Sequence, residues 1–525
     1  MNSATGFTVP ASSGDVTATS SPSAVTAGSP APAASGSYPV LYGPRPVGPY
    51  PRSSPSAGPT ATATPTPIAP SSPTPQPSRS AGSSPAPTDL PSPTTSATPN
   101  PSATPSAKAT ITPTPSPKPT PVPTAAPTAT PAKGELPAQS DSFVDTIGTD
   151  THFDYHDTPY VTQWPTVSAA LIKSGIRHIR DGSPQYYEWG TRLAVLGEAG
   201  IHHGLGFDTT STAAIMTKAL AEEAPYVDFV EPQNEYDSYA DKDASWVSQL
   251  VAEQHLLYAT VRANPAYNGI TVIGPAMRTQ HNYAKLGNLT NVADVGNLHN
   301  ATCNQNPGTT TDIGIQANIA LVHASTSKPV WTTETGYSDN MNRTCGLPDD
   351  IIAKYDPRMV AERFMAGEPR TYFYEFCDMP VDAEFGATGL LYATGQPKPQ
   401  YTSLASMIAI LADRGPSFEP TRVQYTLSGN VANVNHLLLQ KRDGTYILML
   451  WIEMPAWKSL NYTNVGGNRI DVAPQAVTVS FPTRRSSASM YHYNDDQQLT
   501  LQSEPSNAAT FSISVTDTIS FFEFK

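Results

Sequence analysis

Cysteine and charged residues are both scarce in this sequence. Only 3 of its 525 residues are Cys, and 14% are Asp, Glu, Lys or Arg, against about 25% in average proteins. Three cysteines are too few for a fold built on disulfide bonds. The chain also has no run of about 18 apolar residues, so the sequence predicts no membrane-spanning helix. Residues 1–15 lack the basic and apolar pattern of a secretory signal peptide.

Proline, by contrast, is abundant and unevenly distributed. Of the 54 prolines, 33 lie in residues 1–137 and 21 in residues 138–525. The first segment is rich in Pro, Ser, Thr and Ala and has few apolar side chains to bury, so we expect residues 1–137 to be a disordered linker. Such linkers are common in proteins that act on insoluble polymers or cell surfaces. This favours a secreted or cell-surface protein, associated with a cell wall through its N-terminal segment.

The remainder of the chain is acidic. Residues 1–137 hold 6 of the 31 basic and 3 of the 44 acidic residues, which leaves 25 basic and 41 acidic residues, a net charge of −16, for residues 138–525. Binding to a nucleic-acid backbone requires clustered Lys and Arg. We therefore expect no nucleic-acid partner.

Residues 138–415 alternate between short β-rich runs and segments with helical periodicity. The predicted strands are 143–149, 176–179, 201–207, 227–232, 270–274, 294–299, 329–333 and 371–376. Eight strand–helix units of this size predict an α/β fold, the (β/α)8 TIM barrel. The competing doubly wound sheet normally has a glycine-rich phosphate loop after its first strand, and residues 149–153 contain no glycine.

Residues 416–525 have a different pattern, with short β-rich runs and no helical periodicity. The predicted strands are 423–427, 436–441, 446–451, 476–481, 489–493, 498–501, 510–515 and 518–524, with a hairpin-turn signal at Asp443-Gly444. This spacing predicts a small β-sandwich domain that follows the barrel.

Two glutamates follow predicted strands of the barrel. Glu235 follows the fourth strand and Glu334 the seventh, so both should lie at the barrel face where active sites occur. Two facing carboxyl groups are what cleavage of a glycosidic bond requires, one as nucleophile and one as acid and base. Arg180, after the second strand, could keep Glu334 ionised. Asn234 could bind a sugar 2-hydroxyl group.

With these residues the sequence resembles clan A of the retaining glycoside hydrolases, closest to families 39 and 5. The resemblance covers roughly residues 142–413 and implies that Glu235 is the acid/base and Glu334 the nucleophile. The matching residues are the Asn234-Glu235 pair and Glu334, with supporting matches at His152, Arg180 and His299 after strands one, two and six.

One departure from the clan concerns the eighth strand. The clan usually has a Trp there, which forms the floor of the first sugar site, whereas this strand contains Tyr374 and Phe376. Tyr337 and Tyr374 are predicted to contact the sugar. The resemblance implies a polysaccharide or oligosaccharide substrate and leaves its identity open. The alternative from another class is a non-catalytic carbohydrate-binding or cell-wall protein on the same barrel.

We expect no metal ion and no cofactor. The residues that come closest to a ligand set lack the spacing of a metal-binding motif: His152, Asp154, His156 and Asp157. Cys303 and Cys345 fall in loops after neighbouring strands, where an exported protein could join them in a disulfide bond, and the sequence leaves open whether it does. Cys377 is expected to be a buried free thiol.

Overall fold

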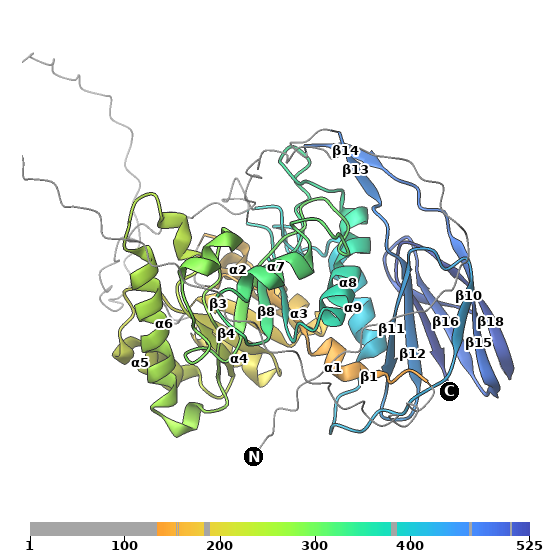
Figure 1. The fold of residues 1–525 in the computed structure, drawn as a ribbon, viewed down its shortest axis with the longest axis horizontal. Helices are drawn as coiled ribbons and strands as arrows, with labels where there is room; N and C mark the ends of the chain where they lie inside the picture. The colour runs from red at the N-terminus through yellow and green to blue at the C-terminus, as the bar shows by residue number, and fades with distance from the viewer. Residues whose placement is uncertain are drawn as a thin grey trace, which may run out of the picture. The chain divides into compact units, whose positions relative to one another are not determined.

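The computed structural model describes residues 134–525 except 154, 156, 183–189, 380–385, 461–464 and 504–506 (Figure 1). The linker predicted for residues 1–137 lies outside the described residues, apart from 134–137. Within these, Glu135 forms an antiparallel bridge with Val423. Its carboxylate accepts a hydrogen bond of 2.5 Å from the hydroxyl group of Tyr425.

Parallel strands form the predicted (β/α)8 barrel. Their order along the sheet is β6-β5-β4-β3-β2-β9-β8-β7. The ring closes through a parallel bridge between Ile273, after β6, and Val295, before β7. The strands are β2 (Ile147–Asp150), β3 (His178–Gly182), β4 (His202–Gly206), β5 (Val227–Glu231), β6 (Thr271–Val272), β7 (Gly296–His299), β8 (Val330–Thr335) and β9 (Thr371–Phe373).

Helices connect these strands and bury one apolar face each. Leu250, Leu257 and Val261 of α6 are fully buried, as their helical spacing predicts, and Gly175 ends α3 with φ +79°. No described helix is long and apolar enough to cross a membrane. The α-helices are α1 (Ser140–Val144), α2 (Pro159–Thr162), α3 (Trp164–Ser174), α4 (Gly190–Glu198), α5 (Ala213–Glu223), α6 (Trp246–Arg262), α7 (Ile315–Val322), α8 (Asp349–Met365) and α9 (Pro399–Leu411), and the 3-10 helices are η1 (Tyr236–Tyr239), η2 (Pro265–Tyr267) and η3 (Gln280–Lys285).

The first predicted strand, 143–149, is wrong over its first residues. Phe143 and Val144 belong to helix α1, and the strand begins at Ile147. The hydroxyl group of Ser140 donates a hydrogen bond of 2.6 Å to the carbonyl oxygen of Leu411, which anchors α1 to the end of α9. A short apolar run does not by itself distinguish a strand from a buried helical turn.

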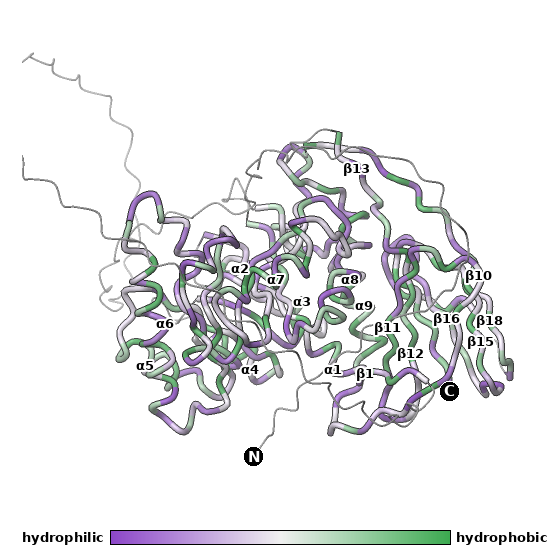
Figure 2. The backbone as a smooth tube through the Cα atoms, viewed as in Figure 1, coloured by the Kyte–Doolittle hydropathy of each residue, from purple (hydrophilic) through white to green (hydrophobic). Residues whose placement is uncertain are grey.

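The C-terminal region is a two-sheet β-sandwich, as predicted. One sheet has the order β1-β11-β12-β19-β16-β17 and the other β10-β15-β18, and hydrophobic residues concentrate on strands such as β11 and β12 (Figure 2). Strand β1 (Ala138–Gln139) pairs in parallel with β11 and is drawn beside the blue strands in Figure 1. The remaining strands are β10 (Thr426–Gly429), β11 (Val434–Gln440), β12 (Tyr446–Ile452), β13 (Trp457–Ser459), β14 (Gly467–Arg469), β15 (Gln475–Arg485), β16 (Ala488–Tyr493), β17 (Leu499–Ser503), β18 (Ala508–Val515) and β19 (Ser520–Phe524).

Buried polar contacts join the barrel to the sandwich. Arg358 of α8 is fully buried. Its Nε donates to a carboxylate oxygen of Glu453 at 3.0 Å, and its Nη1 donates to the carbonyl oxygen of Asp517 at 3.2 Å. A buried guanidinium group without partners is strongly destabilising. Loss of the contacts between the sandwich and α8 would therefore destabilise the protein.

Candidate active site

The C-terminal ends of four barrel strands bring polar side chains together. Arg180 lies on β3, His299 ends β7 and Glu334 lies on β8. Glu235 follows β5 and precedes η1. All four residues are buried, so their charges interact in a medium that screens them far less than water does.

The guanidinium group of Arg180 organises this cluster. Its Nη1 donates to Glu334 Oε1 at 2.7 Å and its Nη2 to Asn234 Oδ1 at 2.7 Å. Its Nε donates to Glu231 Oε1, and Nη1 also lies 3.4 Å from Asp150 Oδ2. One cation therefore contacts three carboxyl groups and also binds the amide oxygen of Asn234, a residue that is exposed.

Glu235 is held in a backbone conformation that is uncommon for a residue other than glycine. Its φ is +42°, and such residues often occur at functional sites. Burial raises the pKa of Glu235 to about 8, and the negative charge of Asp237 adds to this shift, while Arg278 and Arg180 oppose it. Its carboxyl group therefore holds a proton at neutral pH.

Glu334 has a different environment. Burial raises the pKa of Glu334, but His299 and Arg180 oppose this shift, and the hydrogen bond from Arg180 favours the ionised form. His299 Nδ1 lies 2.9 Å from Glu235 Oε1 and 3.4 Å from Glu334 Oε2, so the imidazole ring lies between the two carboxyl groups. An oxygen atom of Glu235 and an oxygen atom of Glu334 lie within 4.8 Å of each other.

The same geometry raises the question of a metal ion. Glu235, His299 and Glu334 each present one donor atom, and the three atoms lie within 4.8 Å of one another. The guanidinium group of Arg180 already contacts Glu334 at 2.7 Å, so a divalent cation bound here would face a fixed positive charge. We therefore assign no metal ion to this cluster. Of the residues considered for a metal site from the sequence, 154 and 156 lie outside the described residues.

A second group of predicted residues gathers where β2 and β9 end. The side chain of His152 is 14% exposed, and its Nε2 lies 3.6 Å from Glu375 Oε2. Its ring stacks on Tyr155 at 4.6 Å between centroids and meets Tyr374 edge to face at 5.5 Å. Tyr374 is partly exposed, whereas Phe376 is fully buried. Of the two candidates for the missing Trp, only Tyr374 can therefore present its ring to a ligand.

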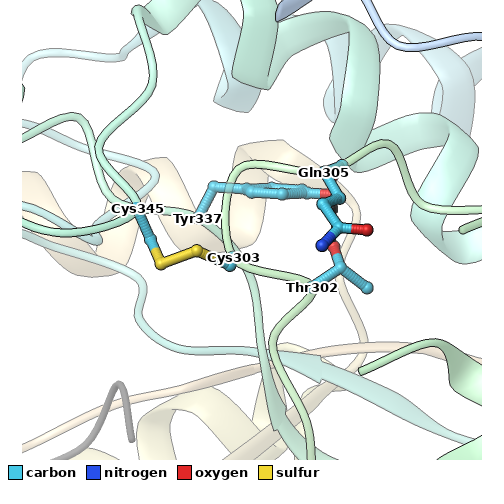
Figure 3. The surroundings of a disulfide bond; sticks show 5 residues. All are labelled: Thr302, Cys303, Gln305, Tyr337 and Cys345. Carbon is cyan, nitrogen blue, oxygen red and sulfur yellow. Dashed lines mark hydrogen bonds between the residues drawn. A yellow bond between two sulfur atoms is a disulfide. The ribbon is translucent and has the colours of Figure 1, made fainter. Parts of the chain in front are cut away.

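The side chain of Tyr337 is buried and bonded to the loop after β7. It is 5% exposed, its hydroxyl group donates to the carbonyl oxygen of Gln305 at 3.1 Å, and it shares a hydrogen bond of 2.8 Å with the hydroxyl group of Thr302 (Figure 3). Burial and these two hydrogen bonds do not favour contact of Tyr337 with a sugar, which stays a prediction from the sequence.

The disulfide bond that the sequence left open is present beside Tyr337. Cys303 and Cys345 are joined, with their Cα atoms 4.7 Å apart (Figure 3). The bond links the loop after β7 to the loop after β8, which are the loops that follow His299 and Glu334. Cys377 is a buried free thiol, as expected.

Sequence reasoning missed several buried polar residues of this site. Asp150 and Glu231 end β2 and β5, and Asn297 and Thr333 lie inside β7 and β8. Their signal is a polar residue in a strand that is otherwise buried, as Glu231 is in the run Val-Asp-Phe-Val-Glu. Such residues are rarely buried without a partner.

Comparisons with known proteins identify the fold. No protein-family model and no curated protein match the chain. Its structure is similar to a family 39 glycoside hydrolase from the gut symbiont Bacteroides cellulosilyticus WH2, at 14% identity and a TM-score of 0.51, over 74% of this chain and 82% of that one. It is also similar to a glucosidase from Croceicoccus marinus, at 11% identity and a TM-score of 0.53, over 75% of this chain and 97% of that one. The described part of the chain therefore has the (β/α)8 fold of glycoside hydrolases, as its resemblance to clan A implied.

Proposed function

We propose that the protein is a retaining glycoside hydrolase of a polysaccharide or oligosaccharide, with Glu334 as nucleophile and Glu235 as acid and base. One observation carries the proposal: two buried carboxyl groups face each other in different electrostatic environments. Burial raises the pKa of both groups, but of the two only Glu334 accepts a hydrogen bond from Arg180, which favours its ionised form. Two carboxyl groups whose environments push their pKa values apart are the usual basis of paired acid and nucleophile roles.

The separation of the carboxyl groups supports retention of configuration. Retaining enzymes have carboxyl groups about 5–5.5 Å apart, and inverting enzymes about 6.5–9.5 Å apart because a water molecule must fit between carboxylate and sugar. One oxygen atom of Glu235 and one of Glu334 lie within 4.8 Å of each other, a separation that fits the retaining enzymes better than the inverting ones.

The reaction then has two steps. A carboxylate oxygen of Glu334 bonds to the anomeric carbon while the glycosidic C–O bond breaks, and Glu235 gives its proton to the departing oxygen. In the second step a water oxygen bonds to the anomeric carbon and the bond to Glu334 breaks. Glu235, now a carboxylate, takes a proton from that water molecule and is ready for another cycle.

Three further residues are proposed to bind the sugar. The Oδ1 atom of Asn234 is bonded to Arg180, which directs the amide nitrogen of this exposed side chain toward a ligand. Tyr374 and His152 present partly exposed rings at the end of β9 and after β2, and aromatic rings of this kind stack on sugar faces.

We also propose that the protein is secreted or held at a cell surface. The disulfide bond between Cys303 and Cys345 supports an oxidising compartment, because such bonds rarely persist in the cytosol. The proline-rich segment at residues 1–137 supports association with a cell wall. Fractionation of cells that express the full chain tests this proposal.

Single substitutions test the catalytic assignment. Glu334→Ala should abolish hydrolysis of aryl glycosides, and azide should partly restore turnover by forming a glycosyl azide of inverted configuration. Glu235→Ala should lower kcat/KM for poor leaving groups by about 10²–10⁴-fold, the usual contribution of a general acid. The exposed Glu198 provides a matched control in Glu198→Ala. Wild-type turnover in either site variant contradicts the assignment, and sugar binding without turnover by the wild type supports the non-catalytic alternative.

A further inference from the structure

A continuous chain of buried hydrogen bonds runs behind the two glutamates. It starts at Glu231, whose Oε2 accepts a hydrogen bond of 3.1 Å from Asn297 Nδ2. Asn297 Oδ1 accepts one of 2.7 Å from the hydroxyl group of Thr333. Thr333 Oγ1 lies 3.0 Å from His299 Nε2, and His299 Nδ1 lies 2.9 Å from Glu235 Oε1. All five residues are buried, so water does not compete for these bonds.

The direction of each hydrogen bond follows from the first. Glu231 forms an ion pair with Arg180, so its carboxylate only accepts, and the amide of Asn297 must turn its NH₂ group toward it. This leaves the carbonyl oxygen Oδ1 facing Thr333. Because an amide oxygen cannot donate, the hydroxyl group of Thr333 donates its one proton to that oxygen.

The same logic fixes the histidine. With its proton committed to Asn297, the hydroxyl oxygen of Thr333 can only accept from His299, so Nε2 must carry a hydrogen. Burial lowers the pKa of His299 to about 4, so the ring is neutral at pH 7 and its other nitrogen, Nδ1, has a lone pair. Of the two carboxyl groups beside Nδ1, Glu235 Oε1 is at hydrogen-bond distance, 2.9 Å, and Glu334 Oε2 is farther away, at 3.4 Å. Glu235, which is protonated at neutral pH, therefore carries the proton of this hydrogen bond.

We propose that Thr333 and Asn297 are positioning residues that hold His299 in its Nε2–H tautomer, so that Nδ1 accepts the proton of Glu235. The hydrogen on Nε2 follows from the hydrogen bonds, the neutral state of the ring from its burial, and the consequence for turnover rests on the proposed function. When Glu235 gives this proton to the leaving oxygen, the hydrogen bond to His299 Nδ1 breaks and the Glu235 carboxylate is left facing a lone pair. This arrangement disfavours the anion and favours return of a proton from water in the second step.

Other charged groups also face this pair and set the background for its titration. Each acts on Glu235, on His299 or on both through space, and none of them is changed by a substitution at Thr333. They are Asp237 of η1, Arg278 after β6, Arg180 of β3, Glu231 of β5 and Glu334 of β8. A change in titration on substitution of Thr333 therefore reports the hydrogen-bond chain.

Nitrogen NMR of the full chain labelled with ¹⁵N-histidine tests the tautomer without any need for activity. The His299 signals are assigned by their loss in His299→Gln. We expect a protonated Nε2 and an unprotonated Nδ1 at pH 6–7 in the wild type. A ring protonated at Nδ1, or at both nitrogens, overturns the proposal whatever the protein hydrolyses.

The pH dependence of kcat/KM tests the consequence, because its basic limb reports the acid of the free enzyme. Thr333→Val has nearly the same shape but no hydroxyl group. His299 is then free to protonate Nδ1 and to donate to the Glu235 carboxylate. The basic limb should move to lower pH by about one unit, the effect of one added hydrogen bond to the ionised form.

Two variants complete this experiment. Thr333→Ser keeps the hydroxyl group and should restore the wild-type limb. Thr149→Val removes another buried hydroxyl group of the barrel, one that donates to the carbonyl oxygen of Phe373, and should leave the limb in place. An unshifted limb in folded Thr333→Val, or an equal shift in Thr149→Val, overturns the role of the chain in catalysis. Absence of any hydrolysis by the wild type refutes the proposed function and leaves the NMR result to decide the tautomer.

Discussion

Glu253 is a buried acid that is bonded to the backbone next to the candidate site. Its titration should change the free energy of unfolding with pH. It lies on α6 and is 4% exposed. Its Oε1 accepts a hydrogen bond of 3.0 Å from the backbone nitrogen of Gln233, two residues before Glu235. Its Oε2 has no hydrogen-bond partner among the described residues. Burial raises the pKa of Glu253 to about 8, so the folded protein keeps this carboxyl group neutral at pH 7.

The sign and size of the effect follow from proton binding. In the unfolded chain Glu253 titrates near its ordinary pKa of 4.5, and in the folded protein near 8. Between these values the folded state holds one proton more than the unfolded state, so the free energy of unfolding falls as pH rises. The slope for one such group is about 1.4 kcal/mol per pH unit, or about 3 kcal/mol between pH 5 and pH 7.

Glu253→Gln removes this titration while keeping the shape of the neutral acid and an acceptor for Gln233. Urea unfolding of both proteins at pH 5, 6 and 7 measures the difference. We expect the variant to lose less stability than the wild type as pH rises, so that the difference in unfolding free energy changes by up to about 3 kcal/mol. Glu198→Gln, on the protein surface, is the control. Parallel lines for wild type and Glu253→Gln would refute the argument that Glu253 is protonated in the folded protein.

Three other substitutions have expected outcomes. Cys303→Ser breaks the disulfide bond to Cys345 and should lower the free energy of unfolding by about 2–4 kcal/mol; thermal unfolding with and without reductant checks this, and the variant itself should not respond to reductant. Arg180→Met leaves three carboxyl groups without their cation and should cost about 3–5 kcal/mol in urea unfolding, with loss of hydrolysis. Tyr374→Ala should raise KM about two- to tenfold through loss of ring contact, and Tyr374→Trp should not; equal KM values in all three proteins would exclude Tyr374 from the sugar site.

The barrel could be predicted because its signals are local. Each strand is a short apolar run next to a segment with helical periodicity, and the eight predicted strands of the barrel all overlap observed ones. The features that were not predicted depend on contacts between residues far apart in the sequence. Nothing near residues 138–139 indicates that they pair with Leu439 and Gln440, some 300 residues later. Likewise α1, which contains Phe143 and Val144, is bonded through Ser140 to the distant end of α9, a contact that no local pattern encodes.

The candidate site divides in the same way. Arg180, Glu235, His299 and Glu334 were predictable because they lie at or near the C-terminal ends of predicted strands, and the barrel brings these ends together. Their protonation states were not predictable from position alone. These depend on burial and on partners such as Glu231, the last residue of β5, whose contact with Arg180 is visible only in the folded barrel.

The candidate site gathers more buried acids than cations. Arg180 faces the carboxyl groups of Asp150, Glu231 and Glu334, and Glu235 lies beside Glu334. With all four acids ionised, the buried cluster would carry −4 + 1, a net charge of −3, which burial strongly disfavours. Burial raises the pKa of Asp150, Glu235 and Glu334, and Arg180 opposes this shift at all three. Protonation of part of the cluster lowers this charge, and Arg180 stays beside the carboxyl groups that remain ionised. Negative charge fixed in place before substrate binds is what stabilises the positive charge that develops on a sugar as its glycosidic bond breaks. The same burial that makes this cluster costly to fold therefore limits the charge that its proposed chemistry uses.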